Sequence, residues 1–395
     1  MINVIILLIG TNIWTPQQSG TTYDLNKVFF IDPYYGWAVG DDYPKGIILK
    51  TENGGNTWTT VYQTDSAPLR GVWFINRYEG WVVGGTGVPG SYIPQIILHT
   101  TDGGLTWQRV QNQNPNTNWR GAYAVQFINQ KGWIGLGGWA DSMGYVIHTP
   151  NNGSNWINQP LNTTAADVFS LHFIDTLTGV VCGMWNWAYP YDNSGGIVWR
   201  TVNGGDTYTV EDSWNPGPVA MGGYDDIWMC DPNTGYVAGS AGGLQVNYTG
   251  MVKKTINGGE SWTPIRYSST ETYLGLHFIN SQIGWVCGGG GLILFTENGG
   301  NSWSYDISNT NRFLRDIHGV GNHLWAVGTY GTILHLEYVP VQEPTLKIDY
   351  PSLSQIKETK YIDITGRKIE DKFKKGIYFE LNPKGNKIFK LIKIK

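Results

Sequence analysis

Carboxylates are the first residues to test for chemistry, because two of them at a suitable separation can hydrolyse a glycosidic bond. A Gly-rich turn of the form T-x-N-G-G-x-T-W occurs in six copies, and only one copy has an acid at its third position, Asp102. A catalytic group is needed once, whereas a structural turn is needed in every repeat. We therefore interpret all six turns, called boxes below, as structural. Their third residues are Asn53, Asp102, Asn151, Asn203, Asn257 and Asn298.

Other acids could still form a catalytic pair. By their places in predicted loops, the candidates are Asp141, Asp192, Asp225 and Asp226. No sequence motif links any two of them, so we assign no catalytic residue. A glycoside hydrolase remains the alternative to a binding protein.

Histidines and cysteines could bind a metal, and their positions argue against it. His172, His277 and His318 take one equivalent place in three repeats, as packing residues do, and two of these repeats are not neighbours. The cysteines lie within apolar strand patterns and are expected in the core. They are Cys182, Cys230 and Cys287. We predict no metal and no other cofactor.

Cationic side chains suggest a site for a carboxylate. Arg70 and Arg315 each precede the same apolar strand position by two residues, and Arg120 and Lys27 lie near the same height in their own repeats. Together they would form a basic arc near the centre of the molecule. The alternative is that each arginine pairs with a local acid such as Asp316.

Aromatic residues are concentrated in the longer predicted loops and connections. They are Trp119, Trp139, Trp185, Trp187, Tyr189, Tyr191 and Trp214. Exposed flat rings suit a sugar or the apolar side chains of a partner protein. The alternative is that these rings fold back and cover the ends of the strands.

The elements that position these residues repeat with a period of 40 to 56 residues, as in "VFFIDPYYGWAVG" and "LHFINSQIGWVCG". Each unit is predicted to have four strands, A to D, with the box as the C–D hairpin pinned to its own blade. Seven such units indicate a seven-bladed, all-β propeller of antiparallel blades. The seventh unit lacks a box and a strand D, so residues 13–19 are expected to complete it. Boxes would lie on one face, and B–C loops and D–A connections on the other.

The boxes resemble the Asp-box, or bacterial neuraminidase, repeat. Combined with the motif F-I-D-x-x-x-G-W-A-V-G, they resemble the photosystem II stability/assembly factor-like propellers over about residues 13–338. Members of that family assist photosystem assembly without being enzymes, and many relatives with this repeat are secreted bacterial proteins. Sialidases and xyloglucanases also carry the repeat. However, this sequence lacks the "RIP"-type motif and six-blade count of the former and the second propeller of the latter.

Composition divides the chain near residue 340. Residues 341–395 hold 13 of 27 basic and 7 of 31 acidic residues, about +6, and all 19 tryptophans precede them. We predict a linker at 339–346 and a small β module at 347–395. Its elements "DITGRKI", "KKGIYF" and "FKLIKI" resemble a type IX secretion sorting domain.

Residues 1–12 contain an apolar run interpreted as a truncated signal peptide, too short to span a bilayer. The net charge of −4 gives no case for nucleic acid. These patterns predict a secreted or cell-surface monomer, without an integral membrane segment, that engages secretion machinery through its tail. We expect a non-catalytic propeller that binds a protein or a glycan.

Overall fold

The computed structural model describes residues 12–85, 95–113, 120–137, 144–161, 163, 166–185, 194–216, 221–243 and 246–340, and four strands beyond residue 359. The chain divides into two compact units, Met1–Val339 and Pro340–Lys395. Nearly all of residues 1–12, the expected signal peptide, lies outside the described part. Within that part, no helix has the length and apolar character needed to cross a membrane.

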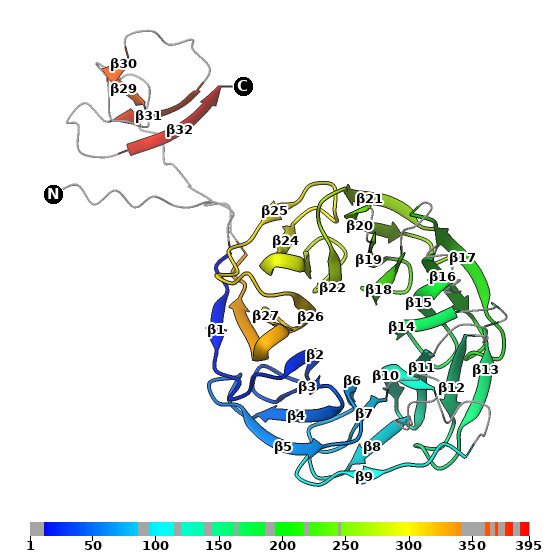
Figure 1. Ribbon diagram of the computed structural model, residues 1–395. Coiled ribbons are helices and arrows are strands. Elements are labelled where there is room, and N and C mark those ends of the chain that lie inside the picture. The colour runs from blue at the N-terminus through cyan, green and yellow to red at the C-terminus, as the bar shows by residue number, and fades with distance from the viewer. Residues whose placement is uncertain are drawn as a thin grey trace. The chain divides into compact units, whose positions relative to one another are not determined.

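Seven four-stranded antiparallel sheets form the first unit and surround a central opening (Figure 1). This confirms the predicted seven-bladed propeller. Blades 1 to 3 consist of β2 (Asp24–Phe30), β3 (Gly36–Asp42), β4 (Lys45–Thr51) and β5 (Thr59–Thr64); β6 (Leu69–Phe74), β7 (Gly80–Gly84), β8 (Ile96–Thr100) and β9 (Gln108–Arg109); and β10 (Gly121–Ile128), β11 (Lys131–Gly137), β12 (Tyr145–Thr149) and β13 (Ile157–Pro160).

The next three blades follow the same order. They consist of β14 (Ala166–Phe173), β15 (Gly179–Trp185), β16 (Gly195–Thr201) and β17 (Thr209–Trp214); β18 (Met221–Met229), β19 (Gly235–Gly243), β20 (Val246–Thr255) and β21 (Thr263–Ser268); and β22 (Tyr273–Phe278), β23 (Gly284–Gly288), β24 (Ile293–Thr296) and β25 (Ser304–Tyr305). In blade 5 the segment expected as a B–C loop is largely paired, because the β19–β20 ladder continues to Gly243 and Val246.

Blade 7 combines both ends of the propeller. Its strands are β26 (Leu314–Val320), β27 (His323–Gly328), β28 (Thr332–Glu337) and β1 (Thr15–Gln17). Thr15 pairs with His335 and Gln17 with Ile333, so the N-terminal strand closes the ring as predicted. Figure 1 shows β1 in blue beside the orange strands of blade 7.

Aromatic stacking joins neighbouring blades. Trp37 of strand β3 stacks on Phe74 of the next blade with ring centroids 3.5 Å apart, and the Trp107 ring meets Phe74 edge-on. Trp325 and Phe30 stack in the same way across the closure between blades 7 and 1. These repeated Trp and Phe positions therefore form the core between the sheets.

Every innermost strand, the strand A of each blade, contains a β-bulge. The pairing register with strand B shifts once in each of these strands, β2, β6, β10, β14, β18, β22 and β26. Each shift skips a single residue, which directly follows a buried residue near the start of the strand. A bulge leaves one residue unpaired and changes the direction of its side chain. Seven bulges at one level therefore distinguish seven residues at one end of the central opening.

The second unit is a four-stranded sheet in the order β30-β29-β31-β32. Its strands are β29 (Lys360–Asp363), β30 (Lys368–Ile369), β31 (Gly376–Leu381) and β32 (Ile388–Ile394). The predicted elements "KKGIYF" and "FKLIKI" overlap strands β31 and β32 of this sheet.

Candidate binding face

Each box is closed by hydrogen bonds among its own residues. In blade 1 the Thr51 hydroxyl donates to Asn53 Oδ1 over 3.0 Å and accepts the Gly55 amide proton over 2.8 Å, while the Thr57 amide donates to Asn53 Oδ1 over 2.9 Å. Corresponding bonds to the third residue occur at Asn151, Asn203, Asn257 and Asn298. The amide oxygens are therefore occupied inside the turns.

Asp102 makes the same contacts in blade 2. Its carboxylate accepts the Thr106 hydroxyl over 2.6 Å and the Thr106 amide over 2.9 Å. These bonds lower the pKa of Asp102 to about 2. A carboxylate held ionised inside its own turn is a poor general acid, so it acts as the asparagines do.

The boxes also connect adjacent blades, which the repeat pattern did not predict. The indole of a strand B tryptophan donates to a glycine carbonyl in the box of the next blade. The pairs are Trp37 with Gly103 at 3.1 Å, Trp133 with Gly204 at 2.9 Å and Trp325 with Gly54 at 3.1 Å. These three boxes, in blades 1, 2 and 4, therefore each fasten two blades, rather than only pinning their own hairpin.

The strand B tryptophan of blade 6 has a different hydrogen-bond acceptor, because the next blade, blade 7, has no box. The Trp285 indole donates to the buried Asp306 carboxylate over 2.9 Å. Asp306 also accepts from the Trp14 indole over 3.1 Å and from the Asn12 side chain. One carboxylate thus joins blade 6 to the N-terminal strand.

The bulged residues form a ring, called the mouth ring, on the face opposite the boxes. In blade order it consists of Asn26, Arg70, Tyr123, Phe169, Asp225, Leu274 and Arg315. With Lys27 these side chains line a pocket of about 260 Å³ at the end of the central channel. The blades repeat their packing residues but differ at this position, so the mouth ring is the chemically distinctive part of the face.

Two arginines and an asparagine form the polar side of the mouth ring. Arg315 donates to Asn26 Oδ1 and, over 2.7 Å, to the half-exposed Asp24 carboxylate. Arg70 donates to the Gly85 carbonyl over 3.3 Å and lies over the Tyr123 ring at 4.9 Å. Arg315 therefore has a local acid partner, as the alternative reading expected, whereas Arg70 is held by a carbonyl and a ring.

The other side of the mouth ring is aromatic and apolar, apart from Asp225. Tyr123 and Phe169 lie with ring centroids 5.8 Å apart. Asp225 Oδ2 accepts the Ser240 amide over 3.1 Å and its hydroxyl over 3.3 Å. Burial, and secondarily Asp226, raises the pKa of Asp225 to about 8. At neutral pH this side chain is a carboxylic acid, which can donate a hydrogen bond.

Below the mouth ring, Lys27 bridges three blades across the channel. Its ammonium lies 2.8 Å from Asp316 of blade 7 and 3.2 Å from Asp226 of blade 5. Asp226 also accepts the Ser170 hydroxyl over 2.7 Å and the Leu276 amide over 3.1 Å. Although burial opposes its charge, the two acids raise the pKa of Lys27. Asp226 is thus fully engaged and is a poor candidate for catalysis.

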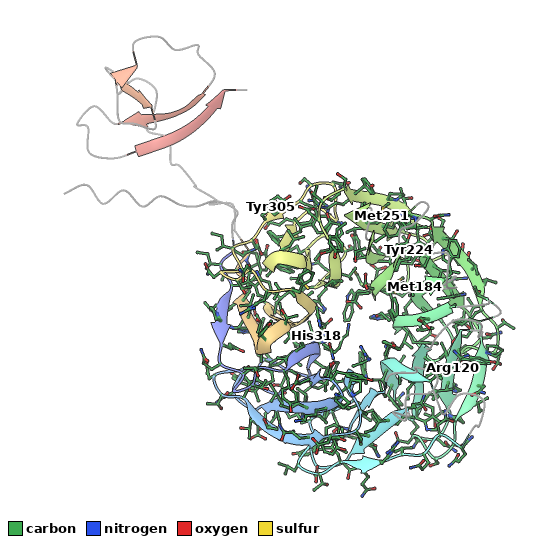
Figure 2. All side chains as sticks on the ribbon, viewed as in Figure 1. Arg120, Met184, Tyr224, Met251, Tyr305 and His318 are labelled. Atoms are coloured by element: carbon green, nitrogen blue, oxygen red, sulfur yellow. The ribbon has the colours of Figure 1, made fainter. Side chains whose placement is uncertain are left out.

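The remaining predicted arginine does not join the ring. Arg120 is only 2% exposed and lies over the Tyr145 ring at 4.9 Å. Figure 2 shows it toward the outside of the ring of blades, whereas His318 lies beside the opening.

Only two of the predicted aromatic residues are described. Trp185 packs against the core between blades 3 and 4, and Trp214 against the core of blades 4 and 5, 5.9 Å from the Tyr224 ring. Both are partly buried, as the alternative reading expected. The other predicted aromatics, Trp119, Trp139, Trp187, Tyr189 and Tyr191, and the acids Asp141 and Asp192, lie outside the described residues.

His172 and His318 line the channel below the mouth ring, and His277 is buried beside them among aromatic rings. His277 and His318 have ring centroids 5.2 Å apart, and Trp228 lies 4.4 Å from His277. Burial lowers the pKa of His172 to about 4 and of His318 to about 3, so both are neutral at physiological pH. In the described part of the chain, no three His, Cys, Asp or Glu side chains are grouped to hold a metal ion.

Sequence reasoning named three of the seven mouth-ring residues, Arg70, Arg315 and Asp225. In every repeat the bulged residue stands two positions before the first residue of the apolar strand A motif, which is Val28 in blade 1. Applied to every repeat, this spacing gives Asn26 rather than Lys27 in blade 1, and Tyr123 rather than Arg120 in blade 3. The spacing therefore marks the bulged residue in every repeat, whether or not that residue is charged.

The fold and the mouth ring define a seven-bladed β-propeller that carries a polar pocket at one end of its channel. Residues 8–117 match the family model described as Photosynthesis system II assembly factor YCF48. That match covers the first two blades and less than half of the chain. No curated protein matches the sequence.

Solved structures with this fold cover most of the chain. One is YCF48 bound to a D1 peptide, with 18% identity and a TM-score of 0.59 over 84% of this chain and 99% of that chain. Another is YCF48 from Cyanidioschyzon merolae, with 19% identity and a TM-score of 0.59 over 82% and 99%. The WD40 propeller domain of Doa1 has 10% identity and a TM-score of 0.54 over 84% and 98%. At these identities the likeness establishes the fold.

Proposed function

We propose that this protein is a non-catalytic binding propeller whose partner is a protein, and that an acidic group of the partner enters the pocket at the mouth ring. The observation that carries the proposal is the position of Arg70 and Arg315, from blades 2 and 7, in the lining of one pocket. Two guanidinium groups around one opening suit a carboxylate. The similar YCF48 structure with a bound D1 peptide supports a protein partner.

The charges around the pocket support a carboxylate rather than a cation. Asp226 and Asp316 are paired with Lys27 below the pocket, and Asp225 is neutral near pH 7 because burial raises its pKa to about 8. Asp24 offsets part of the Arg315 charge. Lys27 balances only one of the two acids, so one negative charge remains below the pocket. In the lining itself Arg70 forms no ion pair with a residue that the structure describes, and Arg315 can exchange Asp24 for a stronger bidentate partner.

The experiment is a selection from a phage-displayed library of random twelve-residue peptides on the purified chain. We expect peptides with Asp or Glu to be enriched, and this preference to disappear in the double variant Arg70→Gln, Arg315→Gln. Affinity for a selected peptide should also fall steeply with salt. Selection of peptides without acidic residues, or equal binding by the double variant, would refute the proposal.

A glycan is the second class of ligand that the sequence suggests, and a glycoside hydrolase is the enzymatic alternative. A glycan array on the same protein tests both, because a bound glycan that is also cleaved reveals catalysis. The engagement of Asp226 by Lys27, Ser170 and the Leu276 amide favours simple binding.

We also propose that the protein is exported, and that residues 347–395 act as its sorting signal. The motifs of the tail and the apolar run in residues 1–12 support this proposal. Fusing residues 340–395 to a periplasmic reporter in a bacterium with type IX secretion should move the reporter to the cell surface or medium. A reporter that stays in the periplasm, while a known sorting domain moves it, would contradict the proposal.

A further inference from the structure

Tyr330 adopts an unfavourable backbone conformation on the face that carries the mouth ring. It lies in the B–C turn of blade 7, Thr329–Gly331, with φ 58° and ψ 38°. The equivalent turn of blade 6 places Gly290 there, with φ 66° and ψ 23°. A bulky residue rarely takes this left-handed conformation, which costs about 1 kcal/mol relative to glycine. The local fold is therefore satisfied by glycine and does not require tyrosine.

The side chain of Tyr330 does not recover that cost by burial. The residue is 63% exposed. The Arg312 guanidinium lies over its ring, 4.1 Å from the centroid. Arg312 is itself exposed, and it forms no ion pair with any residue that the structure describes. An aromatic ring and an uncompensated cation are thus displayed together.

Phe313 extends the same surface. It is 46% exposed, and its carbonyl accepts the Thr329 amide over 2.9 Å, which ties it to the Tyr330 turn. Its ring borders Gly289 in the turn of blade 6. We call the surface formed by Arg312, Phe313 and Tyr330 the blade 7 shelf.

Asp24 connects the shelf to the mouth ring. One carboxylate oxygen accepts the Tyr330 amide over 3.0 Å, and the other accepts from Arg315 over 2.7 Å. The shelf is therefore next to the polar side of the mouth pocket. A partner that places an acid against Arg315 has its neighbouring residues close to the shelf.

We propose that the blade 7 shelf binds an aromatic side chain of the protein partner, a few residues from the acidic group that enters the mouth ring. This inference rests on the proposed function and specifies the class of partner, a peptide that combines an acid with an aromatic residue. Two exposed rings and a stacked guanidinium offer an aromatic side chain both ring contacts and a cation–π contact. The charges of Arg312 and Arg70 complement the acid.

Tyr330→Gly is the decisive variant, because it removes the ring and relieves the backbone. We expect its melting temperature to equal or slightly exceed that of the wild type. The matched control is Tyr248→Ala, which removes a tyrosine that is 61% exposed on the B–C side of blade 5. Blade 6 separates blade 5 from the shelf, so this control should leave partner binding unchanged.

The test repeats the peptide selection on the wild type and the two variants. The wild type should enrich peptides with an aromatic residue near the acid. Tyr330→Gly should keep the acidic preference and lose the aromatic one, while Tyr248→Ala keeps both. With a synthetic copy of a selected peptide, Tyr330→Gly should weaken binding about tenfold, or about 1.4 kcal/mol. Replacing the aromatic residue of the peptide by alanine should cost the wild type the same factor and the variant nothing more.

The outcomes separate the two proposals. An acidic preference without an aromatic one, or an aromatic preference unaffected by Tyr330→Gly, would overturn the shelf and leave the mouth ring standing. Loss of both preferences in the double variant Arg70→Gln, Arg315→Gln is expected, because the acid anchors the peptide. If no acidic peptide is selected by the wild type, both proposals are wrong.

Discussion

Asp225 gives the mouth ring a group that changes charge in an accessible pH range. With its pKa raised to about 8 by burial, it is neutral at pH 7 and becomes a carboxylate as the pH rises. The ionised form would repel an acidic ligand in the same pocket. The chemistry of the pocket is therefore set by the protonation of one residue as well as by its arginines.

We predict that affinity for an acidic peptide falls roughly three- to tenfold between pH 7 and pH 9, as one like charge in a solvated pocket would cause. Asp225→Asn should remove this dependence, since the amide keeps an acceptor for Ser240 and cannot ionise. Fluorescence anisotropy with a labelled peptide measures both curves. Parallel pH profiles for the two proteins would show that another group titrates.

Replacing Lys27 tests how much its ion pairs across the channel contribute to stability. Lys27→Met leaves the buried carboxylates of Asp316 and Asp226 without their cation. We expect a loss of about 3 to 5 kcal/mol in the free energy of unfolding at pH 7. Adding Asp226→Asn and Asp316→Asn should recover much of it. Urea denaturation gives these values, and an equal loss in the triple variant would assign the effect to packing instead.

At the scale of elements, the boxes stabilise the C–D hairpins, and the bulges of the innermost strands place the mouth-ring side chains in the pocket. We predict that Asn53→Ala lowers the free energy of unfolding by about 0.5 to 1.5 kcal/mol, because the exposed Thr57 amide exchanges its Asn53 acceptor for water. Asn56→Ala in the same turn is the control and should change it by less than about 0.5 kcal/mol. Neither variant should alter peptide affinity at a temperature where both are folded. Weaker binding by folded Asn53→Ala would make the box part of the site.

The elements also show what the sequence could predict. Strand order, the boxes and the closing role of residues 13–19 follow from repetition, because every blade needs the same hairpins and the same core. The contacts between blades did not follow, since the hydrogen bond from Trp37 to Gly103 joins residues 66 apart. The mouth ring was found only in part, because a bulge interrupts the alternation from which strand faces are read.

At the scale of the whole molecule, closure of the ring should dominate stability. Trp14 is fully buried and donates to Asp306, so Trp14→Ala should lower the free energy of unfolding by about 3 to 5 kcal/mol. Deleting residues 340–395 should leave the melting temperature of the propeller nearly unchanged, because they form a separate compact unit. Calorimetry on the two variants tests both statements. A large shift on deleting the tail would contradict the division into two units.

The pairing of β1 with β28 also has a consequence in time. Gln17 is synthesised long before its partner Ile333. At ordinary rates of translation, of about 5 to 20 residues per second, the first strand waits roughly 15 to 60 seconds for the last one. During that interval the growing chain is an open row of blades with an unpaired strand at its start, available to chaperones and targeting factors. The ring can be completed only after this interval, so any factor that must hold the start of the chain has to act before the final blade emerges.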